Sequence, residues 1–328
     1  MPRRFLVTGG AGFVGSHLVA TLLDRGDACV VLDNFRTGHR GAVLPGARLI
    51  AGDLGDRAAL DAALADGPWD AVFHFAAMSL VGESMREPYR YLAENIGSGI
   101  ALIEACVRHG VRRFVLSSTA ALFGAPERMP IGEDAPIAPG SPYGESKWVL
   151  ERALMWADRI HGLRSACLRY FNAAGADPAG RLGEAHDPET HLVPLVIDAA
   201  LGRRPALDIF GIDYATHDGT CVRDYIHVAD LADAHLRALD QLEERSVAYN
   251  VGTGSGHSVL EVVRSVERVS GRAVPVRLAG RRAGDPTALV ADPARLRRET
   301  GWAPRFAELD DIVRTAFAWR EAHPCGYG

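Results

Sequence analysis

The chain has 328 residues, of which 48% are hydrophobic and 23% charged. This is close to average globular usage and excludes disordered, collagen-like and coiled-coil proteins. The 36 Lys and Arg residues against 41 Asp and Glu leave a formal charge of -5, without the basic excess that binds nucleic acid or an anionic membrane. We therefore expect neither as a partner.

The five cysteines lie far apart, with no CxxC pair and no signal-like N-terminus, which is typical of reduced thiols in a cytoplasmic protein. The 12 histidines include no HExxH motif and no Cys/His cluster with ligand spacing, so we expect no metal site. No apolar run reaches the ~18 residues that a membrane-spanning helix needs.

Short apolar runs alternate with amphipathic helical patterns in the first half of the chain. Strands are expected at residues 3–8, 28–33, 48–51, 71–75, 113–117 and 164–169, with helices at 17–25, 89–109 and 142–161. Such alternation predicts an α/β fold with a doubly wound parallel sheet, and the continuous apolar strands fit a sheet covered on both faces.

After about Asn172 the alternation gives way to loops rich in Gly and Pro, separated by helical patterns at 192–201, 228–244 and 258–270. We expect a Rossmann domain at residues 1–172, with returning segments near 222–255, and a smaller C-terminal α/β lobe at 173–328. Long loops in a compact protein are usually functional or disordered.

A glycine-rich turn follows the first expected strand. Gly9, Gly12 and Gly15 form G-x-x-G-x-x-G, a variant of the dinucleotide fingerprint that joins a strand to a helix. The N-terminus of that helix offers free N–H groups to phosphates. The loop therefore predicts a dinucleotide site.

Asp33 closes the second strand, where a carboxylate accepts hydrogen bonds from ribose hydroxyls and repels a 2′-phosphate, which favours NAD over NADP. The nearby Arg36 weakens this preference, and Asp33 could instead begin a solvated Asp-Asn turn. Asp53 follows the third strand and either meets the adenine amino group or caps the next helix.

Tyr143 and Lys147 are four residues apart and therefore share one face of a helix. A free tyrosine has a pKa of ~10 and is a poor base at neutral pH. A neighbouring ammonium and an oxidised nicotinamide favour the phenolate, so we expect the pKa of Tyr143 to be lowered. In an arbitrary sequence the pair would be an ordinary surface pair, but downstream of a dinucleotide loop it indicates a base.

Ser117, Ser118 and Thr119 stand where the fifth strand ends, at the sheet edge where ligands bind in open α/β folds. Thr119 is our candidate for a hydroxyl that bonds the reacting oxygen and relays its proton to Tyr143. Ser117 and Ser118 fit equally well as hydroxyls that satisfy backbone groups.

In this order, the glycine loop, Asp33, Thr119 and the Tyr143/Lys147 pair resemble the extended short-chain dehydrogenase/reductases. Later segments narrow the resemblance to the UDP-glucose 4-epimerase family over essentially the whole chain: His74-Phe75-Ala76-Ala77, Val81-Gly82-Glu83-Ser84, Leu168-Arg169-Tyr170-Phe171-Asn172, Asp218-Gly219-Thr220, Val222-Arg223-Asp224-Tyr225-Ile226-His227 and His323-Pro324-Cys325-Gly326-Tyr327.

The resemblance implies three groups of site residues. Tyr143 is the catalytic base, Lys147 binds the nicotinamide ribose, and Thr119 holds the sugar. NAD is bound by Gly9, Gly12, Phe13, Val14, Gly15, Asp33, Asn34, Thr37, Gly38, Asp53, Leu54, Phe75, Ala76, Ala77, Ser79, Lys147, Tyr170 and Phe171. UDP-sugar is bound by Thr119, Tyr143, Asn172, His191, Leu192, Phe210, Arg223, Arg282, Asp285 and Leu289.

Within the last group, the resemblance places Arg223 and Arg282 on the pyrophosphate, for which guanidinium groups are suited, and Asp285 on the uridine ribose. Three positions depart from the family pattern: Ser79 replaces a frequent Lys, His191 replaces a frequent Asn, and Leu289 occupies the position that helps decide whether a 2-N-acetyl group fits.

The implied activity is reversible inversion of UDP-glucose and UDP-galactose at C4 through a 4-keto sugar, in a cytoplasmic homodimer. A 4-epimerase of UDP-GlcNAc/UDP-GalNAc or of UDP-pentoses shares the same catalytic residues and stays open. A nucleotide-sugar dehydratase is disfavoured, because Ala120 and Ala121 stand where its acid pair would follow Thr119. A non-catalytic NAD-binding protein is disfavoured, because Tyr143 and Lys147 are both kept.

Overall fold

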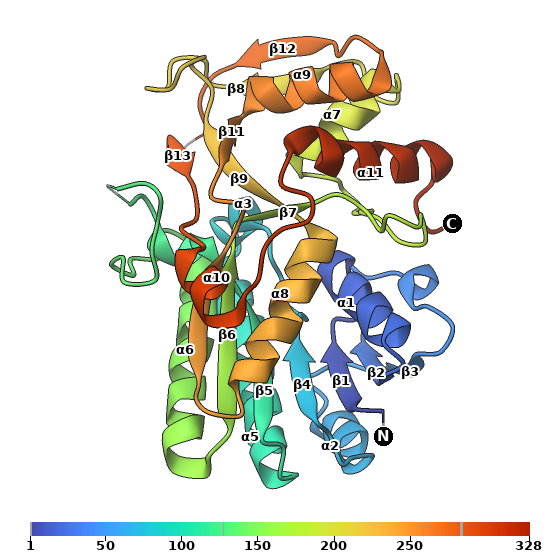
Figure 1. Ribbon diagram of the computed structural model, residues 1–328, viewed down its shortest axis with the longest axis vertical. Coiled ribbons are helices and arrows are strands. Elements are labelled where there is room, and N and C mark those ends of the chain that lie inside the picture. The colour runs from blue at the N-terminus through green and yellow to red at the C-terminus, as the bar shows by residue number, and fades with distance from the viewer. Residues whose placement is uncertain (1, 127, 283–284) are drawn as a thin grey trace.

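The computed structural model describes residues 2–126, 128–282 and 285–328. Its main element is a seven-stranded parallel sheet in the order β10-β6-β5-β4-β1-β2-β3 (Figure 1). The strands are β1 (Arg4–Thr8), β2 (Ala28–Asp33), β3 (Arg48–Ala51), β4 (Ala71–His74), β5 (Arg113–Thr119), β6 (Arg164–Tyr170) and β10 (Val247–Val251). The chain reverses its winding direction between β1 and β4, which is where ligands bind in such sheets.

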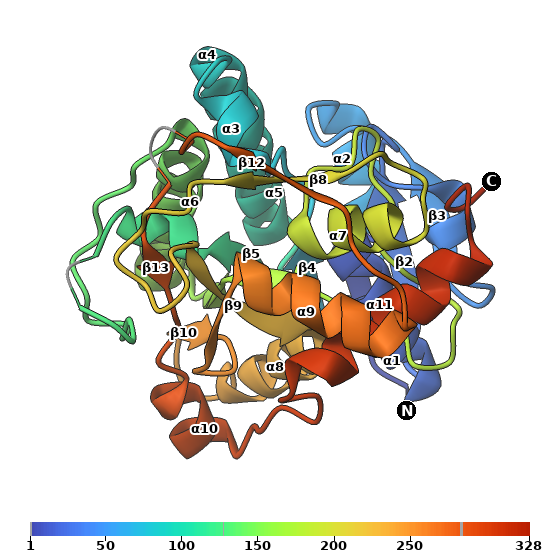
Figure 2. The same ribbon diagram turned by 90° about the horizontal axis from the view of Figure 1, so that it is seen from above.

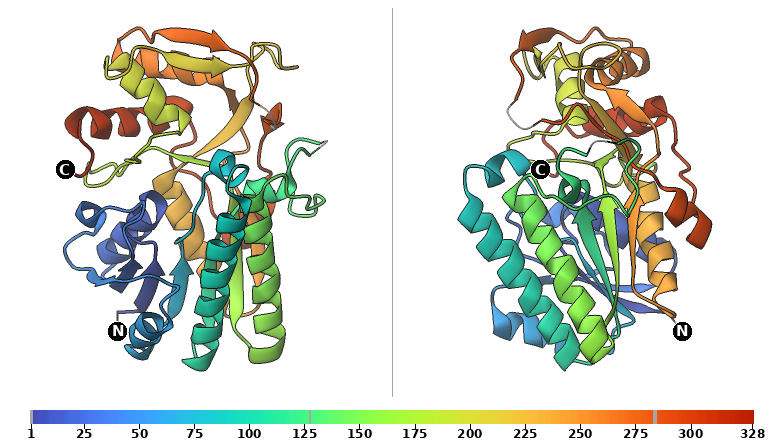
Figure 3. Two further views of the ribbon diagram at one scale, coloured as in Figure 1. Left: turned by 180° about the vertical axis from the view of Figure 1, so that it is seen from behind. Right: turned by 90° about the vertical axis from the view of Figure 1, so that its left-hand side faces the viewer.

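Helices cover both faces of this sheet (Figures 1 and 3). One face carries α1 (Phe13–Asp24), α8 (Val228–Gln241) and α10 (Ala294–Thr300). The other carries α2 (Arg57–Ala65), α5 (Gly97–Arg108) and α6 (Pro142–His161). Fully buried Phe5 and Phe73 meet edge to face on adjacent strands, with ring centroids 5.6 Å apart. The α/β doubly wound fold predicted from the alternating pattern is thus confirmed.

The helix expected at 89–109 is present in the structure and contains one widened turn. It consists of α4 (Pro88–Tyr91), a π-helical turn η2 (Leu92–Ile96) and α5, which follow one another without a gap. Within the turn, Asn95 bonds the N–H and C=O of Met78 at 2.9 and 3.0 Å. Widened helical turns of this kind are frequent at functional sites, and here the turn faces the loop that follows β4.

The C-terminal half forms a second, smaller α/β layer above the main sheet (Figure 2). Its strands are β7 (Asn172–Ala174), β9 (Val222–His227), β11 (Gly256–Ser258) and β13 (Ala288–Leu289) in one sheet, and β8 (Leu207–Phe210) with β12 (Val276–Ala279) in another. Around them pack α7 (Leu192–Ala200), α9 (Val259–Ser270) and α11 (Leu309–Ala322). The remaining short helices are η1 (Arg40–Ala42), α3 (Val81–Ser84) and η3 (Ala120–Phe123).

Three elements of the second half return to the first: β10, α8 and α10. β10 pairs with β6 from Val247↔Ala166 to Val251↔Tyr170, and α8 packs against α1. The domain boundary at Asn172 stays a prediction. All five cysteines are free, and within the described residues no helix is both long and apolar enough to span a bilayer.

Candidate active site

The glycine loop between β1 and α1 is sterically required. A Cβ on Gly9, whose φ is +73°, would lie 2.4 Å from the nitrogen of Ala76, and one on Gly15 would lie 2.2 Å from the oxygen of Gly9. Gly12 is the N-cap of α1, with no acidic residue in the following turn. The first N–H groups of a helix lack partners within it. The loop therefore presents free donors and a bare backbone, the cradle that a pyrophosphate needs.

Asp33 lies at the carboxyl end of β2 and is buried. Its carboxylate accepts hydrogen bonds from the backbone N–H of Ala11 at 3.0 Å and of Phe35 at 2.8 Å. The bond from Phe35 forms the Asp-Asn turn that was the alternative interpretation of Asp33. The bond from Ala11 connects β2 with the glycine loop. Asp33 therefore does both: it shapes the turn and faces the crevice.

Asp53 does not cap the next helix, since Asp56 is the N-cap of α2. It accepts hydrogen bonds from Asn34 at 2.7 Å and from the N–H of Gly55 at 2.8 Å, and these bonds lower the pKa of its carboxyl group. Arg36 is paired with Glu94, so the cation that weakened the preference for NAD is already engaged.

A pocket follows the carboxyl ends of β1 to β4. Eleven predicted cofactor residues line it: Gly9, Gly12, Asp33, Asn34, Thr37, Gly38, Asp53, Leu54, Phe75, Ala76 and Ala77. Seven do not: Phe13, Val14, Gly15, Ser79, Lys147, Tyr170 and Phe171. Ser79 is exposed on the loop after β4, whereas Phe75 and Tyr170 pack against His235, with ring centroids 4.9 and 6.2 Å away.

Tyr143 and Lys147 lie in the first turns of α6, which begins at N-cap Ser141 with Pro142 at its first position. Both side chains are buried, with 7% and 1% of the residue exposed. The ammonium of Lys147 donates to the carbonyl of Ser117 at 2.8 Å, so the helix is fixed to the end of β5. The hydroxyl of Ser117 bonds that of Tyr170 at 2.7 Å.

The expected lowering of the Tyr143 pKa is wrong for the chain by itself. Burial raises the pKa of Tyr143, the nearby Tyr170 raises it further, and the hydroxyl of Thr119 opposes them. Lys147 is not among the causes of the shift, and burial lowers its own pKa to about 8. The phenol is therefore neutral at pH 7 unless further positive charge enters the site.

Thr119 is the hydroxyl of this strand end that lowers the pKa of Tyr143, so its side chain lies beside the phenol. Its Oγ1 also accepts from the N–H of Ala121 at 3.1 Å and so caps η3. Ser118 is engaged elsewhere, since it donates to the buried Glu151 at 2.6 Å, which pairs with Arg169. Of the three hydroxyls at this strand end, Thr119 remains directed to the base.

The predicted UDP residues gather around β9 and β13. Arg223 pairs with Asp285 at 3.1 Å and lies opposite Leu289 in the strand register. The guanidinium of Arg282 stacks on Phe210, with 3.9 Å from Cζ to the ring centroid. Asn172 begins β7, which pairs with β9, and Leu192 begins α7. Cationic, aromatic and carboxylate groups thus share one region, as a nucleoside diphosphate site requires.

The predicted contact of His191 with UDP stays a prediction, and in the structure its imidazole also has partners within the chain. Its Nδ1 lies 2.9 Å from a carboxylate oxygen of Glu184 and 3.1 Å from one of Glu189. These carboxylates raise the pKa of His191 to about 10, against the effect of burial. His186 completes the group, and its pKa is raised to about 9 by the same carboxylates.

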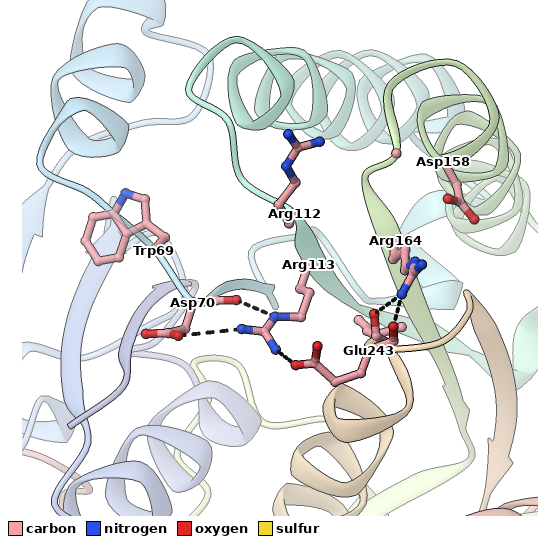
Figure 4. Close-up of a pocket in the computed structure, with 9 residues that line it drawn as sticks. Trp69, Asp70, Arg112, Arg113, Asp158, Arg164 and Glu243 are labelled. Atoms are coloured by element: carbon pink, nitrogen blue, oxygen red, sulfur yellow. Dashed lines mark hydrogen bonds and ion pairs between the residues drawn. The ribbon is translucent and has the colours of Figure 1, made fainter. Parts of the chain in front are cut away.

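A second pocket lies at the opposite edge of the sheet, before β4, β5 and β6 (Figure 4). Its charged groups bond one another: Arg113 donates to the carbonyl of Asp70 at 2.8 Å and pairs with Glu243, while Arg164 donates to the carbonyl of Leu242 at 3.2 Å. Ligands of open α/β sheets bind at the other edge, so this pocket is not the active site.

Sequence reasoning missed several residues that build the crevice. Met78, Glu94, Asn95 and Ser98 line it. Asn95 also donates to Ser146 at 3.1 Å and so connects the loop after β4 with α6. The only sequence signal was a polar residue within a helical pattern, which does not distinguish a buried positioning residue from a surface one.

Comparisons with known proteins agree with this geometry. The NAD dependent epimerase/dehydratase family matches residues 5–252. A UDP-glucose 4-epimerase of Lacticaseibacillus casei is 47% identical over 324 residues, which are 98% of this chain and 98% of that protein.

Two solved structures are also similar. The UDP-glucose 4-epimerase from Brucella ovis in complex with NAD is 46% identical, with a TM-score of 0.93 over 96% of this chain and 98% of that one. The enzyme from Stenotrophomonas maltophila with bound NAD and formylated UDP-arabinopyranose is 38% identical, with a TM-score of 0.94 over 98% and 99%. The chain therefore belongs to the NAD dependent epimerase/dehydratase family and groups with its UDP-glucose 4-epimerases.

Proposed function

We propose that the chain is a UDP-glucose 4-epimerase that inverts C4 of UDP-glucose and UDP-galactose with tightly bound NAD. The observation that carries this proposal is the buried group at the ends of β5 and α6. There the hydroxyl of Thr119 lies close enough to Tyr143 to lower the pKa of its phenol, and Lys147 is fixed to Ser117, beside a dinucleotide crevice. A base, a hydroxyl relay and a cation thus meet where a sugar can reach a cofactor.

The residues present fit NAD. The glycine loop would hold the pyrophosphate through backbone N–H groups, and Asp33 would accept the ribose hydroxyls. Phe75 and Tyr170 would flank the nicotinamide side, next to Lys147. When bound, NAD+ supplies a hydride acceptor and a positive charge near the phenol.

Catalysis by the chain's own groups begins with proton removal. Thr119 hydrogen-bonds the 4-hydroxyl of the sugar, and Tyr143 takes up its proton while C4 gives up a hydride. Because burial raises the pKa of Tyr143, the phenolate forms only when neighbouring cations compensate. Lys147 does not lower the pKa of Tyr143 in the chain by itself, so the compensating charge would come from the bound nicotinamide, and the low polarity of the site would strengthen its effect.

Inversion requires that the 4-keto sugar turn over and receive the hydride on its other face. The nucleotide would be anchored by Arg223, Arg282 and Asp285, which lie in the C-terminal lobe rather than at the reacting end. Anchoring by UDP leaves the hexose free to rotate. The same lobe supplies Phe210 for the uracil ring and Leu289 for the sugar wall.

The direct test is to incubate the purified protein, without added cofactor, with UDP-galactose, UDP-GalNAc and UDP-arabinose separately, and to separate the epimers. We expect UDP-galactose to yield UDP-glucose. Failure to convert any of the three, in protein that retains NAD, would reject the proposal and leave a non-catalytic NAD-binding protein.

A broader substrate range is the second candidate. It is favoured by the formylated UDP-arabinopyranose bound to the Stenotrophomonas maltophila relative and by the moderate size of Leu289. Conversion of UDP-GalNAc in the same experiment would show that Leu289 leaves room for an N-acetyl group, and conversion of UDP-arabinose would extend the range to pentoses.

A homodimer built through α5 and α6 is also proposed. Four apolar residues on these helices are exposed: Ile100 is 43% exposed, Met155 49%, Trp156 57% and Ile160 65%. Covering them with a second copy would remove an apolar surface from water. Light scattering coupled to gel filtration should give twice the chain mass, and Trp156→Glu should give the monomer mass. A cytoplasmic location stays a prediction.

A further inference from the structure

The loop between β7 and α7 brings together four side chains that the reaction does not use as a group. They are Glu184, His186, Glu189 and His191, and their ligand atoms all lie within 4.8 Å of one another. The carboxylates are buried, with only 6% and 7% of the Glu184 and Glu189 side chains exposed. Two buried carboxylates facing two imidazoles are an unusual arrangement for a loop.

The spacing of these atoms is that of a small tetrahedral ion. Bonds of about 2.1 Å from Zn²⁺ to nitrogen and oxygen separate neighbouring ligands by about 3.4 Å. Here Nδ1 of His191 lies 2.9 and 3.1 Å from oxygens of Glu184 and Glu189. Nδ1 of His186 lies 3.4 and 3.5 Å from oxygens of the same carboxylates.

One atom in each of two ligand groups lacks a hydrogen bond. Nδ1 of His186 and Oε2 of Glu189 are buried atoms without a hydrogen-bond partner in the described part of the chain. Buried polar atoms normally have such partners. The two atoms lie 3.5 Å apart, which is an ion-pair contact but too long for a good hydrogen bond. An ion bound between them would satisfy both.

We propose that Glu184, His186, Glu189 and His191 bind one divalent zinc ion in a closed, structural site. Imidazole nitrogen and carboxylate oxygen are both zinc ligands, and four protein ligands leave no open position for a reacting water. Two carboxylates balance the two positive charges. The proposal departs from the expectation of no metal site, because the spacing Glu-x-His-x-x-Glu-x-His matches no motif that the sequence analysis considered.

The site lies where the two halves of the molecule meet. The carbonyl of Ala185 accepts from His39 at 2.8 Å, and the His186 ring lies 6.4 Å from that of Phe13 in the glycine loop. Arg320 of α11 donates to the carbonyl of Glu184 at 3.3 Å, and His191 is the N-cap of α7. A bound ion would therefore fix α7 of the lobe relative to the glycine loop.

The test uses the NAD-containing protein, stripped of metal by a chelator and titrated with Zn²⁺ against a chromophoric competitor. We expect one ion per chain with a dissociation constant below about 1 μM, on the scale that structural zinc sites reach. Co²⁺ in place of Zn²⁺ should give the intense visible absorption of a tetrahedral complex. His186→Ala and Glu189→Gln should each weaken binding at least tenfold.

His161→Ala is the matched control, since it removes an exposed histidine from the end of α6 and should leave Zn²⁺ affinity unchanged. A dissociation constant above about 100 μM, a pale octahedral Co²⁺ spectrum, or equal affinity in the control and the His186→Ala variant would overturn the proposal. The Zn²⁺ titration of the unaltered protein decides whether the site exists, so misfolding of a variant would not change that conclusion.

Discussion

At the carboxyl ends of β1, β2 and β4 the dinucleotide crevice is formed largely by backbone, whereas the lobe around β9 and β13 presents long side chains. In the crevice, a Cβ on Gly15 would lie 2.2 Å from a backbone oxygen, and Asp33 bonds two backbone N–H groups. In the lobe, Arg223 pairs with Asp285, and Arg282 stacks on Phe210. We therefore expect substitutions that add atoms to weaken NAD binding in the crevice. Substitutions that remove atoms should weaken UDP-sugar binding in the lobe.

The largest effect on turnover is expected at Tyr143, where the two regions meet. Tyr143→Phe removes the proton acceptor and should lower kcat by a factor of about 100 or more, as for loss of a general base. Tyr249→Phe, which removes a hydroxyl that bonds Glu299 at 2.8 Å outside the site, is the control. Near-normal turnover of Tyr143→Phe would refute its role.

Gly15→Ala adds one methyl group to the crevice. Because the new Cβ would press on the backbone of Gly9 and Gly10, overpacking should cost ~1–3 kcal/mol and weaken NAD binding by a factor of about 5 to 150. NAD content per chain after purification measures this. Gly82→Ala, at a glycine with open space around it, should retain NAD fully. Equal NAD content in the two variants would show that the crevice tolerates added atoms.

Arg223→Ala removes a side chain from the lobe. Loss of one charge-assisted phosphate contact should raise the KM for UDP-galactose about tenfold, with little change in kcat. Steady-state kinetics with UDP-galactose measure KM and kcat separately. The control is Arg277→Ala, which removes an exposed guanidinium that pairs with Asp208. If KM rises equally in both variants, Arg223 does not hold the substrate.

The smallest effect is expected on the pH dependence of stability, from His74 at the end of β4 on the crevice side of the molecule. Its Nδ1 bonds Thr8 at 2.7 Å, and burial, together with Lys147, lowers its pKa from 6.5 to about 3. The unfolded chain therefore gains this proton first as the pH falls, so stability is complete above pH 6.5 and is lost progressively toward pH 3.

Between pH 8 and pH 6 this single group should cost about 1 kcal/mol of unfolding free energy. His74→Gln, which can keep the bond to Thr8, should lose correspondingly less stability over that interval in urea unfolding. Identical pH dependence in the two proteins would mean that His74 does not titrate as its burial requires.

The sequence predicted the crevice better than the lobe, for a physical reason. β2 matches its expected bounds because a continuous apolar run marks a strand buried on both faces, and β3, at the sheet edge and only half-buried, also matches its expected bounds. The widened turn in the helix at 89–109 carries Asn95, which bonds a loop distant in sequence, and periodicity reveals neither the turn nor these bonds. The residues of the lobe were assigned through resemblance, because loops bring Arg223 to Asp285 across 62 positions.

One expectation does not hold for the chain by itself, because burial outweighs local spacing. Lys147 and an oxidised nicotinamide were predicted to lower the pKa of Tyr143, but without the cofactor desolvation raises it. Nδ1 of His191 faces Glu184 and Glu189, which spacing alone did not indicate, and its contact with UDP stays a prediction. In both cases the surroundings of a buried group decide its chemistry, and only the folded chain defines them.

The most direct test of the central claim, that hydride leaves and returns within one closed site, follows a label. The purified protein, given UDP-galactose deuterated at C4 and no added cofactor, should form UDP-glucose that keeps its deuterium at C4. UDP-glucose with hydrogen from solvent at C4, or no UDP-glucose at all, would contradict the account.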